Sequence, residues 1–117
     1  MVKKVAKISN KETKAEVWIS KEVYGEAPEK YHFVLKDGKK IKNLKELAES
    51  LSTMGDDVFH HHVNSFRNDF SSWVNDVFNE KTLAEELKHM NNKLGTELIL
   101  YKNFEKKLNK IIKKLSK

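Results

Sequence analysis

The stretch FHHHVNSFRNDFSSWVNDVF, residues 59–78, combines five aromatic side chains, three consecutive histidines and an Asn-Asp pair. Its apolar residues recur every three to four positions, which is the period of a helix with one face in a core. We therefore expect this stretch to form the centre of the fold. The residues predicted to lie in that core are Phe59, His62, Phe66, Asp69, Phe70 and Trp73.

A helix is expected just before this stretch. Asn43 can act as its N-cap, and Glu46 three residues later completes a pattern that resembles a capping box. Apolar residues then recur at helical spacing as far as Met54, and Gly55 is expected to end the helix. The predicted helix has about three turns.

Two further helices are expected after it. Asp56 can cap the first, which carries apolar residues as far as Phe66, and Asn68 or Asp69 can cap the second. Short amphipathic helices cannot bury their apolar faces separately. We therefore expect the three helices to pack on one another and to build one core.

A β-hairpin is expected ahead of these helices, within residues 30–42. Three apolar residues that alternate with other positions are followed by Asp37-Gly38, a pair that favours a tight type I′ turn. The alternating residues are Tyr31, Phe33 and Leu35. Such a hairpin is too small to be stable alone, so it must lay its apolar face on the helices.

Residues 15–24 are compatible with two interpretations. Ala15, Val17 and Ile19 alternate as in a strand, whereas Val17 and Val23 could share a helix face with their aromatic neighbours. We predict a strand here. Residues 1–14 lack a sustained apolar period and are expected to form a flexible basic arm.

The C-terminal part predicts two more helices. Thr82 can cap the first, which continues to Leu94, and Gly95 is expected to stop it. Thr96 then opens a long final helix in which apolar residues step by three and four positions, the spacing of a coiled-coil seam. The residues of this predicted seam, which we expect to bind a partner, are Tyr101, Phe104, Leu108, Ile111 and Leu115.

These patterns together predict an α+β fold that is mostly α. It consists of a small β-hairpin packed on a compact bundle of four or five helices, with a long C-terminal amphipathic helix. At 117 residues the chain has the size of one domain. We expect residues 15–117 to form that single helical domain.

Positive charge is concentrated at the two ends of the chain. The net charge is +6, with five lysines against one glutamate in residues 1–14 and seven lysines against one glutamate in residues 102–117. Basic ends suit phosphate backbones, although lysine is also common on solvated helix faces. The candidate nucleic-acid-binding residues are Lys3, Lys4, Lys7, Lys102, Lys106, Lys107, Lys110, Lys113 and Lys114.

His60, His61 and His62 raise the question of a metal site, because neutral imidazole is a common metal ligand. Consecutive side chains on a helix point about 100° apart, so three neighbours cannot converge on one ion. We expect no metal site. His62 lies on the apolar face and is predicted to be a core histidine bonded to a backbone carbonyl, to Asn68 or to Asp69.

The sequence contains no recognisable catalytic constellation. It has no nucleophile elbow and no glycine-rich phosphate loop, and it contains only 4 glycines. Caps and turns account for the polar residues between 64 and 69. We expect neither enzymatic activity nor a cofactor, and we infer no small-molecule substrate.

The chain has no cysteine, which excludes disulfides, thiolate nucleophiles and cysteine-ligated metals. No apolar run approaches the length of a membrane span, and the lysines near the N-terminus are not followed by an apolar signal segment. We therefore expect a cytoplasmic protein that does not associate with membranes.

Two segments resemble a known family. PEKYHFVLKDGKKIKNLKELAESL and DDVFHHHVNSFRNDFSSWVNDVFNEKTLAEEL are similar to a family of small archaeal and bacterial domains of unknown function, across about residues 28–87. The matching residues are Pro28, Asp37, Gly38, Asn43, Leu44, Leu47, His62, Val63, Asn64, Asn68, Asp69, Phe70 and Trp73. The resemblance implies no activity, and it leaves the first 27 residues and the lysine-rich helix outside.

Two functional hypotheses follow from the sequence. The first is a non-enzymatic interaction module that binds a protein partner, or a second copy of itself, through the predicted seam. The second is a nonspecific nucleic-acid-associated accessory protein that uses its lysine-rich ends. Lysine acts as a point charge, so it suits contacts to phosphate better than the reading of bases.

Overall fold

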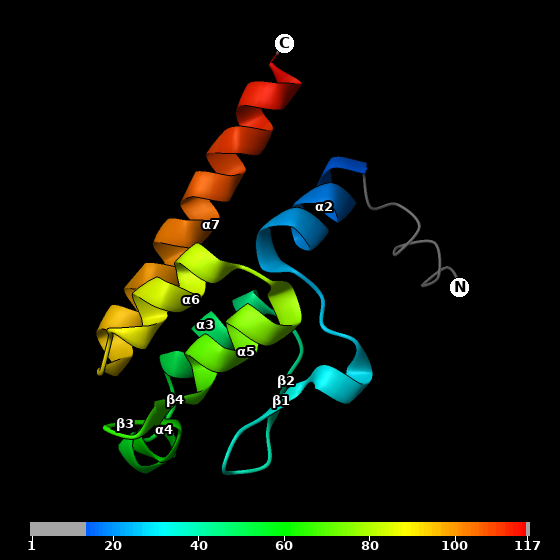
Figure 1. Ribbon diagram of the computed structural model, residues 1–117. Helices are drawn as coiled ribbons and strands as arrows, with labels where there is room; N and C mark the ends of the chain where they lie inside the picture. Colours follow the sequence, from blue (N-terminus) through cyan, green and yellow to red (C-terminus); the bar gives the residue numbers. More distant parts are fainter. Residues whose placement is uncertain (1–13, 117) are drawn as a thin grey trace.

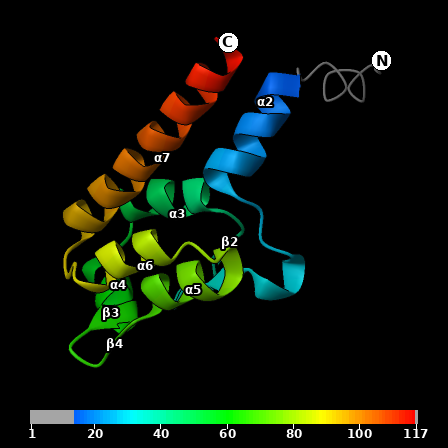
Figure 2. The ribbon, with the colours of Figure 1, turned by 45° about the horizontal axis from the view of Figure 1, so that its top comes forward.

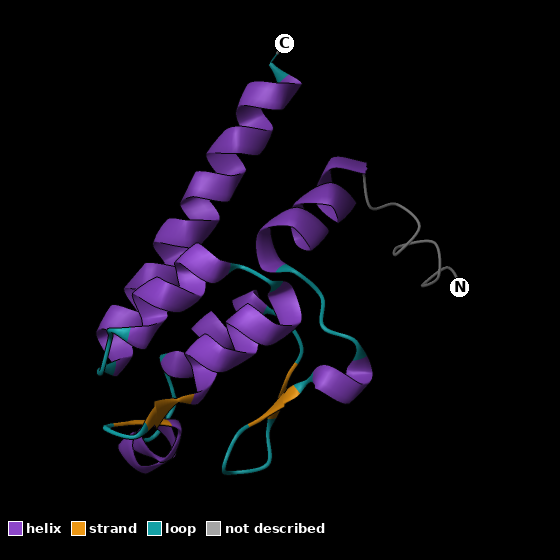
Figure 3. Cartoon of the chain, in the orientation of Figure 1, coloured by secondary structure: helices purple, strands orange, loops and turns teal. Residues whose placement is uncertain are grey.

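The computed structural model describes residues 14–116, which form helices and two small antiparallel hairpins (Figure 1). Helices dominate, as the colouring in Figure 3 shows, and the predicted α+β, mostly α class is confirmed. The predicted basic arm lies outside the described residues except for Lys14, which is the first residue of a helix.

The chain enters the fold through helix α2, Lys14–Ile19, which continues into a π-helical turn, η1, at Ser20–Tyr24. The strand predicted over residues 15–24 is therefore wrong. Helical backbone buries Val23 completely and brings the Tyr24 ring to 5.2 Å from that of Phe104 on the C-terminal helix. Packing on a distant helix decides the conformation of this segment, because its own apolar pattern is compatible with either a strand or a helix.

Gly25 ends this segment in a conformation that requires glycine. Its φ is +72°, and a Cβ atom there would come within 2.7 Å of the Phe78 ring. The chain then passes through a 3-10 turn, η2, at Glu29–Tyr31 and enters the first hairpin.

The expected hairpin consists of β1, Phe33–Val34, and β2, Lys40–Ile41, with Phe33 opposite Ile41. Its turn differs from the predicted type I′ form. Gly38 has φ +95° and donates its N–H to the Leu35 carbonyl over 2.8 Å, whereas Asp37 has no positive φ. The hairpin therefore has the three-residue loop in which a glycine follows a type I turn.

Helix α3, Leu44–Leu51, begins as predicted. The Asn43 side chain accepts a hydrogen bond from the N–H of Glu46 over 2.8 Å, which confirms the N-cap. The helix ends three residues before Met54, the expected limit. Helix α4 spans Asp56–His62 and is preceded by Gly55, so Asp56 is the first helical residue and not the cap.

A second hairpin, unexpected from the sequence, follows α4. Strand β3, Val63–Asn64, pairs with β4, Arg67–Asn68, and helix α4 stops at His62 instead of running through Phe66. The Asn64 side chain accepts the N–H of Phe66 over 2.9 Å and donates to the His60 carbonyl over 3.2 Å. Such side-chain bonds give the backbone an alternative to further helical turns.

Helices α5, Asp69–Phe78, and α6, Lys81–Lys88, pack against each other. Asn68 is the N-cap of α5, one of the two residues expected for that role, and Asn79 ends the helix in the left-handed conformation. Glu80 precedes α6, so Thr82 lies inside that helix and is not its cap.

The final helix, α7, spans Lys93–Leu115 and packs against α3, α6 and η1. Its N-cap is Asn92, which accepts the N–H of Gly95 over 2.7 Å. The predicted stop at Gly95 and start at Thr96 are therefore wrong, because the cap lies three residues earlier and Gly95 belongs to the first turn of α7. Figure 2 shows α2 and α7 near each other at one end of the molecule, with the β3–β4 hairpin at the other.

An aromatic cluster lies in the centre of the core. The Phe33 ring of the first hairpin lies 5.0 to 5.6 Å from the rings of His62, Phe70 and Trp73. Trp73 also donates its ring N–H to the Tyr31 carbonyl over 2.7 Å. The hairpin therefore packs its apolar face on the helices, as the sequence predicts.

Most of the predicted core residues are buried. Phe59, His62, Phe70 and Trp73 lie in the interior, and Asp69 is half-buried. Phe66 is a clear exception, because it is 92% exposed at the turn between β3 and β4. The prediction that Phe66 lies in the core is wrong: once the helix ends at His62, the helical spacing that placed Phe66 inward no longer applies.

Candidate interaction surface

Helix α7 is held firmly at its N-terminal end. The Lys93 ammonium donates to the Met54 carbonyl over 2.8 Å and pairs with the Asp56 carboxylate over 2.8 Å. The Thr96 hydroxyl donates to the Asn92 carbonyl over 2.8 Å. The two Lys93 contacts join the start of α7 to Met54 and Asp56 between α3 and α4, and the Thr96 bond closes the first turn of α7 itself.

One face of α7 is used inside the molecule. Leu100, Phe104 and Ile111 are buried on it, and the Phe104 ring meets Tyr24 edge to face. Lys107, on the same face, pairs with Glu80 over 2.6 Å. Two residues of the predicted partner-binding seam, Phe104 and Ile111, therefore contribute to the core of this chain.

A second apolar face of α7 points to solvent, and we call it the apolar ridge. Five of its members are 44 to 65% exposed, and Leu108 is half-buried. The ridge consists of Leu94, Leu98, Tyr101, Leu108, Ile112 and Leu115. These positions, with Glu105 among them, step by four and three residues through about three heptads and lie within a sector of about 100°.

The ridge shares three residues with the predicted seam, namely Tyr101, Leu108 and Leu115. Leu94, Leu98 and Ile112 were missed by the sequence analysis. Both sets follow a three-and-four spacing, because α7 has two apolar faces whose centres are about 90° apart. The pattern from residue 94 was recognisable in the sequence, but the expected helix break at Gly95 hid its first member.

A groove of about 430 Å³ runs beside the ridge. Its walls come from η1, α3 and α7, and its lining is rich in aromatic and aliphatic side chains. The lining residues are Tyr24, Lys45, Glu49, Tyr101, Phe104, Glu105, Leu108, Asn109 and Ile112. Burial raises the pKa of the Tyr101 hydroxyl, and the carboxylates of Glu97 and Glu49 raise this pKa further.

A third side of α7 carries charge. Lys102, Lys106, Lys110 and Lys113 are exposed there, and Lys114 lies over the Trp18 ring at 5.9 Å. Lys107 differs from these residues, because it is engaged with Glu80 and with the Val23 carbonyl. Of the other candidate nucleic-acid-binding residues, Lys3, Lys4 and Lys7 lie outside the described residues.

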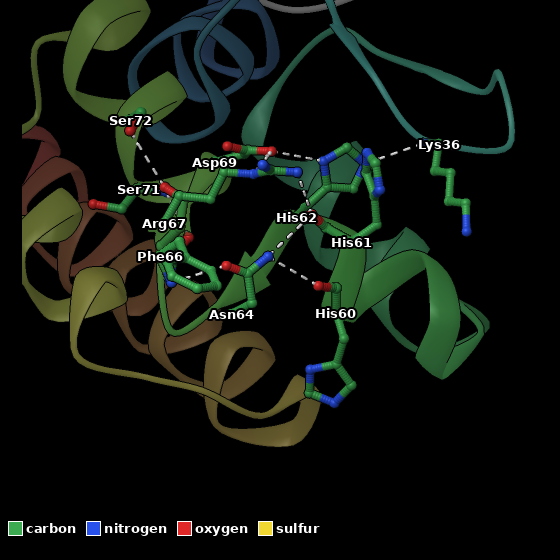
Figure 4. Close-up of polar contacts among 11 residues, drawn as sticks. Lys36, His60, His61, His62, Asn64, Phe66, Arg67, Asp69, Ser71 and Ser72 are labelled. Atoms are coloured by element: carbon green, nitrogen blue, oxygen red, sulfur yellow. Dashed lines mark hydrogen bonds and ion pairs between the residues drawn. The ribbon is translucent and has the colours of Figure 1, made fainter.

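The three histidines of α4, His60, His61 and His62, lie among hydrogen bonds within the fold (Figure 4). His62 donates from Nδ1 to the Asp69 carboxylate over 3.0 Å, and Arg67 donates to the same carboxylate oxygen over 3.3 Å. Arg67 also donates to the His61 carbonyl over 2.7 Å. The polar residues between α4 and α5 therefore fasten the β3–β4 hairpin to the end of α4.

This cluster has no features of a metal centre within the described part of the chain. Residues 14–116 contain no group of three or more His, Cys, Asp or Glu side chains placed to hold an ion. Desolvation lowers the pKa of His61, and the neighbouring His62, Arg67 and Lys36 lower it further against the opposing charge of Asp69.

The fold and this surface define a class, namely a small α-rich domain that ends in a long helix with an exposed apolar ridge. A family model described as a family of unknown function (DUF5752) matches residues 27–116, and the protein belongs to that family. No curated protein and no solved structure matches the chain.

The family match confirms the resemblance to a small domain family of unknown function. It also extends the similarity to α7, which the sequence comparison had left outside, and it excludes α2 and η1. A separate finding concerns membranes. In the described residues, every helix is too short or too polar to be a candidate membrane span.

Proposed function

We propose that the protein is a non-enzymatic interaction module that binds the apolar face of a partner helix along the ridge of α7. The observation that carries this proposal is the exposure of the ridge over 22 residues, from Leu94 to Leu115. Contiguous exposed apolar patches are uncommon on monomers and often mark binding sites. Positions that step by four and three residues suit a helix as the partner.

The surroundings of the ridge support a partner with a particular charge. Lys102 lies directly beside the ridge. Lys106 and Lys113 lie on the same side of the helix as Lys102, but further from the ridge. Acidic residues beside the apolar stripe of a partner helix would face these lysines. Charge complementarity of this kind governs the choice of partner and the register of paired helices.

Two synthetic helices test the proposal. Both carry leucine at the a and d positions of three heptads, but one has glutamate and the other lysine at the flanking positions. We expect the glutamate peptide to bind and to shift the amide resonances of α7 in NMR spectra of the dilute labelled protein. The lysine peptide should bind more weakly, and the difference should shrink at high salt.

Matched variants locate the binding site. Leu98→Lys places a charge on the ridge, whereas Val34→Lys changes a residue of nearly equal exposure on β1. Peptide binding should be lost in the first variant and retained in the second. Equal binding by the two variants, or no binding of the glutamate peptide to the parent protein, would contradict the proposed site.

A second function, nonspecific association with nucleic acid, is supported by one observation. Lys102, Lys106, Lys110 and Lys113 lie exposed along one side of α7. A row of ammonium groups on a helix can follow a phosphate backbone without reading bases. Lys107 contributes less to such a row, because Glu80 neutralises it at 2.6 Å.

The salt dependence of binding tests this second function. Affinity for a duplex of random sequence should fall steeply as salt rises, and the double variant Lys106→Glu/Lys110→Glu should reduce the slope. The control double variant Lys39→Glu/Lys40→Glu changes two exposed lysines of the first hairpin. An identical slope in both double variants, or no binding at low salt, would exclude α7 as the nucleic-acid contact.

A further inference from the structure

We infer that the helix bound along the ridge is α7 of a second copy, in antiparallel orientation and in one defined register. This inference rests on the proposed function and identifies its partner: the second copy supplies Glu105 as the acidic residue that faces Lys102, while Lys106 and Lys113 of both copies lie outside the seam. In this register the two helices are related by a two-fold axis at residue 103. Closed two-fold dimers are the commonest oligomers, and a self-complementary patch is what their interfaces require.

The orientation follows from Glu105, which occupies the step of the ridge pattern between Tyr101 and Leu108. Glu105 forms no ion pair among the described residues. In a parallel pair, equivalent positions face each other, so two Glu105 carboxylates would meet in the seam. Like charges placed there are unfavourable, and the parallel arrangement is therefore disfavoured.

The antiparallel register centred on residue 103 gives Glu105 suitable neighbours. Glu105 then lies level with Tyr101 of the second copy and beside its Lys102. The Tyr101 hydroxyl can donate a hydrogen bond to the carboxylate, and the Lys102 ammonium can pair with it. Because of the two-fold symmetry, both interactions occur twice in the dimer.

The same register also pairs the aliphatic members of the ridge. Leu94 lies opposite Ile112 of the second copy, and Leu98 lies opposite Leu108. Leu108 is half-buried beside the groove of about 430 Å³, so Leu98 of the second copy would extend toward the apolar lining of that groove. Leu94, Leu98, Leu108 and Ile112 therefore each acquire an apolar neighbour, and Leu115 extends past the start of the second α7.

Other antiparallel registers fit the ridge less well. A slide of one heptad step that pairs Leu98 with Leu115 leaves one ridge leucine unpaired, as the favoured register does, but it places Glu105 against Leu108. A buried carboxylate against leucine costs free energy because nothing replaces its hydration. A slide in the opposite direction leaves Leu108, Ile112 and Leu115 unpaired.

Disulfide cross-linking tests the register directly, because the natural chain contains no cysteine. Leu94→Cys and Ile112→Cys chains, one of them lengthened by a tag, are mixed and oxidised gently. We expect a mixed disulfide between the two chains, since paired seam positions satisfy the short Cβ separation that a disulfide needs. A Leu98→Cys and Leu115→Cys mixture should cross-link much less.

The alternatives give distinct products. Efficient self-cross-linking of Leu98→Cys alone would indicate a parallel pair, and preferential cross-linking of Leu98→Cys with Leu115→Cys would indicate the other antiparallel register. Either result would overturn the inferred register. The parent protein should also show twice its chain mass by light scattering at high concentration, and Leu98→Lys should remain a monomer while Val34→Lys dimerises.

A charge exchange provides an independent readout. Glu105→Lys should weaken dimerisation about tenfold, because two lysines then meet across the axis. The double variant Lys102→Glu/Glu105→Lys restores opposite charges and should recover most of the affinity. No recovery would contradict the register.

The two proposals can fail separately. A protein that stays monomeric at high concentration but binds the glutamate peptide would disprove self-association and leave the proposed function standing. A monomer that binds neither peptide would remove both. A dimer that persists in Leu98→Lys would show that the two copies meet through another surface.

Discussion

The Nε2 atom of His62 accepts a hydrogen bond from the backbone N–H of Lys36 over 3.0 Å and so joins helix α4 to the loop of the first hairpin. The other ring nitrogen, Nδ1, lies 3.0 Å from the Asp69 carboxylate. Because Nε2 must offer its lone pair to the Lys36 N–H, the proton of the neutral ring lies on Nδ1. His62 therefore connects three segments of the core.

His62→Ala is expected to destabilise the protein by about 2–4 kcal/mol. The substitution leaves the Lys36 N–H and the Asp69 carboxylate without their partner, and it opens space beside Phe33 and Phe70. Urea unfolding monitored by tryptophan fluorescence measures the change. An effect below about 1 kcal/mol would show that the imidazole bonds contribute little net stability.

Phe66→Ala is expected to change the free energy of unfolding by no more than about 0.5 kcal/mol. Phe66 is 92% exposed, so truncation removes almost no buried surface. The same urea experiment checks this, with Phe59→Ala as the contrasting variant, since Phe59 is fully buried. A large destabilisation by Phe66→Ala would place that ring in the core after all.

Asn68→Ala is expected to cost about 1–2 kcal/mol. One side-chain amide serves two helices: its oxygen accepts the Ser71 N–H over 3.0 Å at the start of α5, and its nitrogen donates to the Leu87 carbonyl over 2.8 Å near the end of α6. Thermal unfolding followed by circular dichroism measures the loss. Asn91→Ala, at an exposed position between α6 and α7, is the control and should be nearly neutral.

Gly25→Ala should be more destabilising than Gly38→Ala. Both glycines have positive φ, so alanine is strained at each and should cost about 1 kcal/mol. Only at Gly25 does the new Cβ also meet the Phe78 ring, at 2.7 Å, whereas nothing lies within 4 Å at Gly38. Equal unfolding midpoints for the two variants would mean that Phe78 moves aside freely.

The Lys93 ammonium, through its hydrogen bond and its charge, holds the pKa of Asp56 below the ordinary value of 3.8. The small stabilisation from this pair is therefore fully present above that value and is lost as the pH falls through the lower pKa of the folded state. An NMR titration of the Asp56 carboxyl should show its pKa rising toward 3.8 in Lys93→Met. Lys88→Met, which changes an exposed lysine of α6, should leave it unchanged.

Local sequence signals predicted much of the fold correctly. Asn43 and Asn68 were recognisable as N-caps, because their side chains satisfy N–H groups only three residues away. The first hairpin was predicted from alternating residues around Asp37-Gly38, although its exact turn was not. Each of these features depends on interactions within a few residues, so the sequence pattern contains the necessary information.

The errors occur where distant contacts decide between local alternatives. The segment from Lys14 to Tyr24 became a helix because Val23 and Tyr24 pack on α7, about 80 positions further along the chain. The Asn64 and Arg67 side chains stopped α4 and moved Phe66 from the predicted core to the surface.

The length, amphipathic character and basic charge of the last helix could be predicted, because its apolar period and its lysines are properties of the chain alone. Which apolar face of that helix is free depends on the packing of the other elements. Val23, Tyr24 and Glu80 take up the face of Phe104 and Lys107, and the face of Leu98 and Ile112 is left in solvent. Helical spacing places both faces on α7, but only packing against other elements can bury one of them.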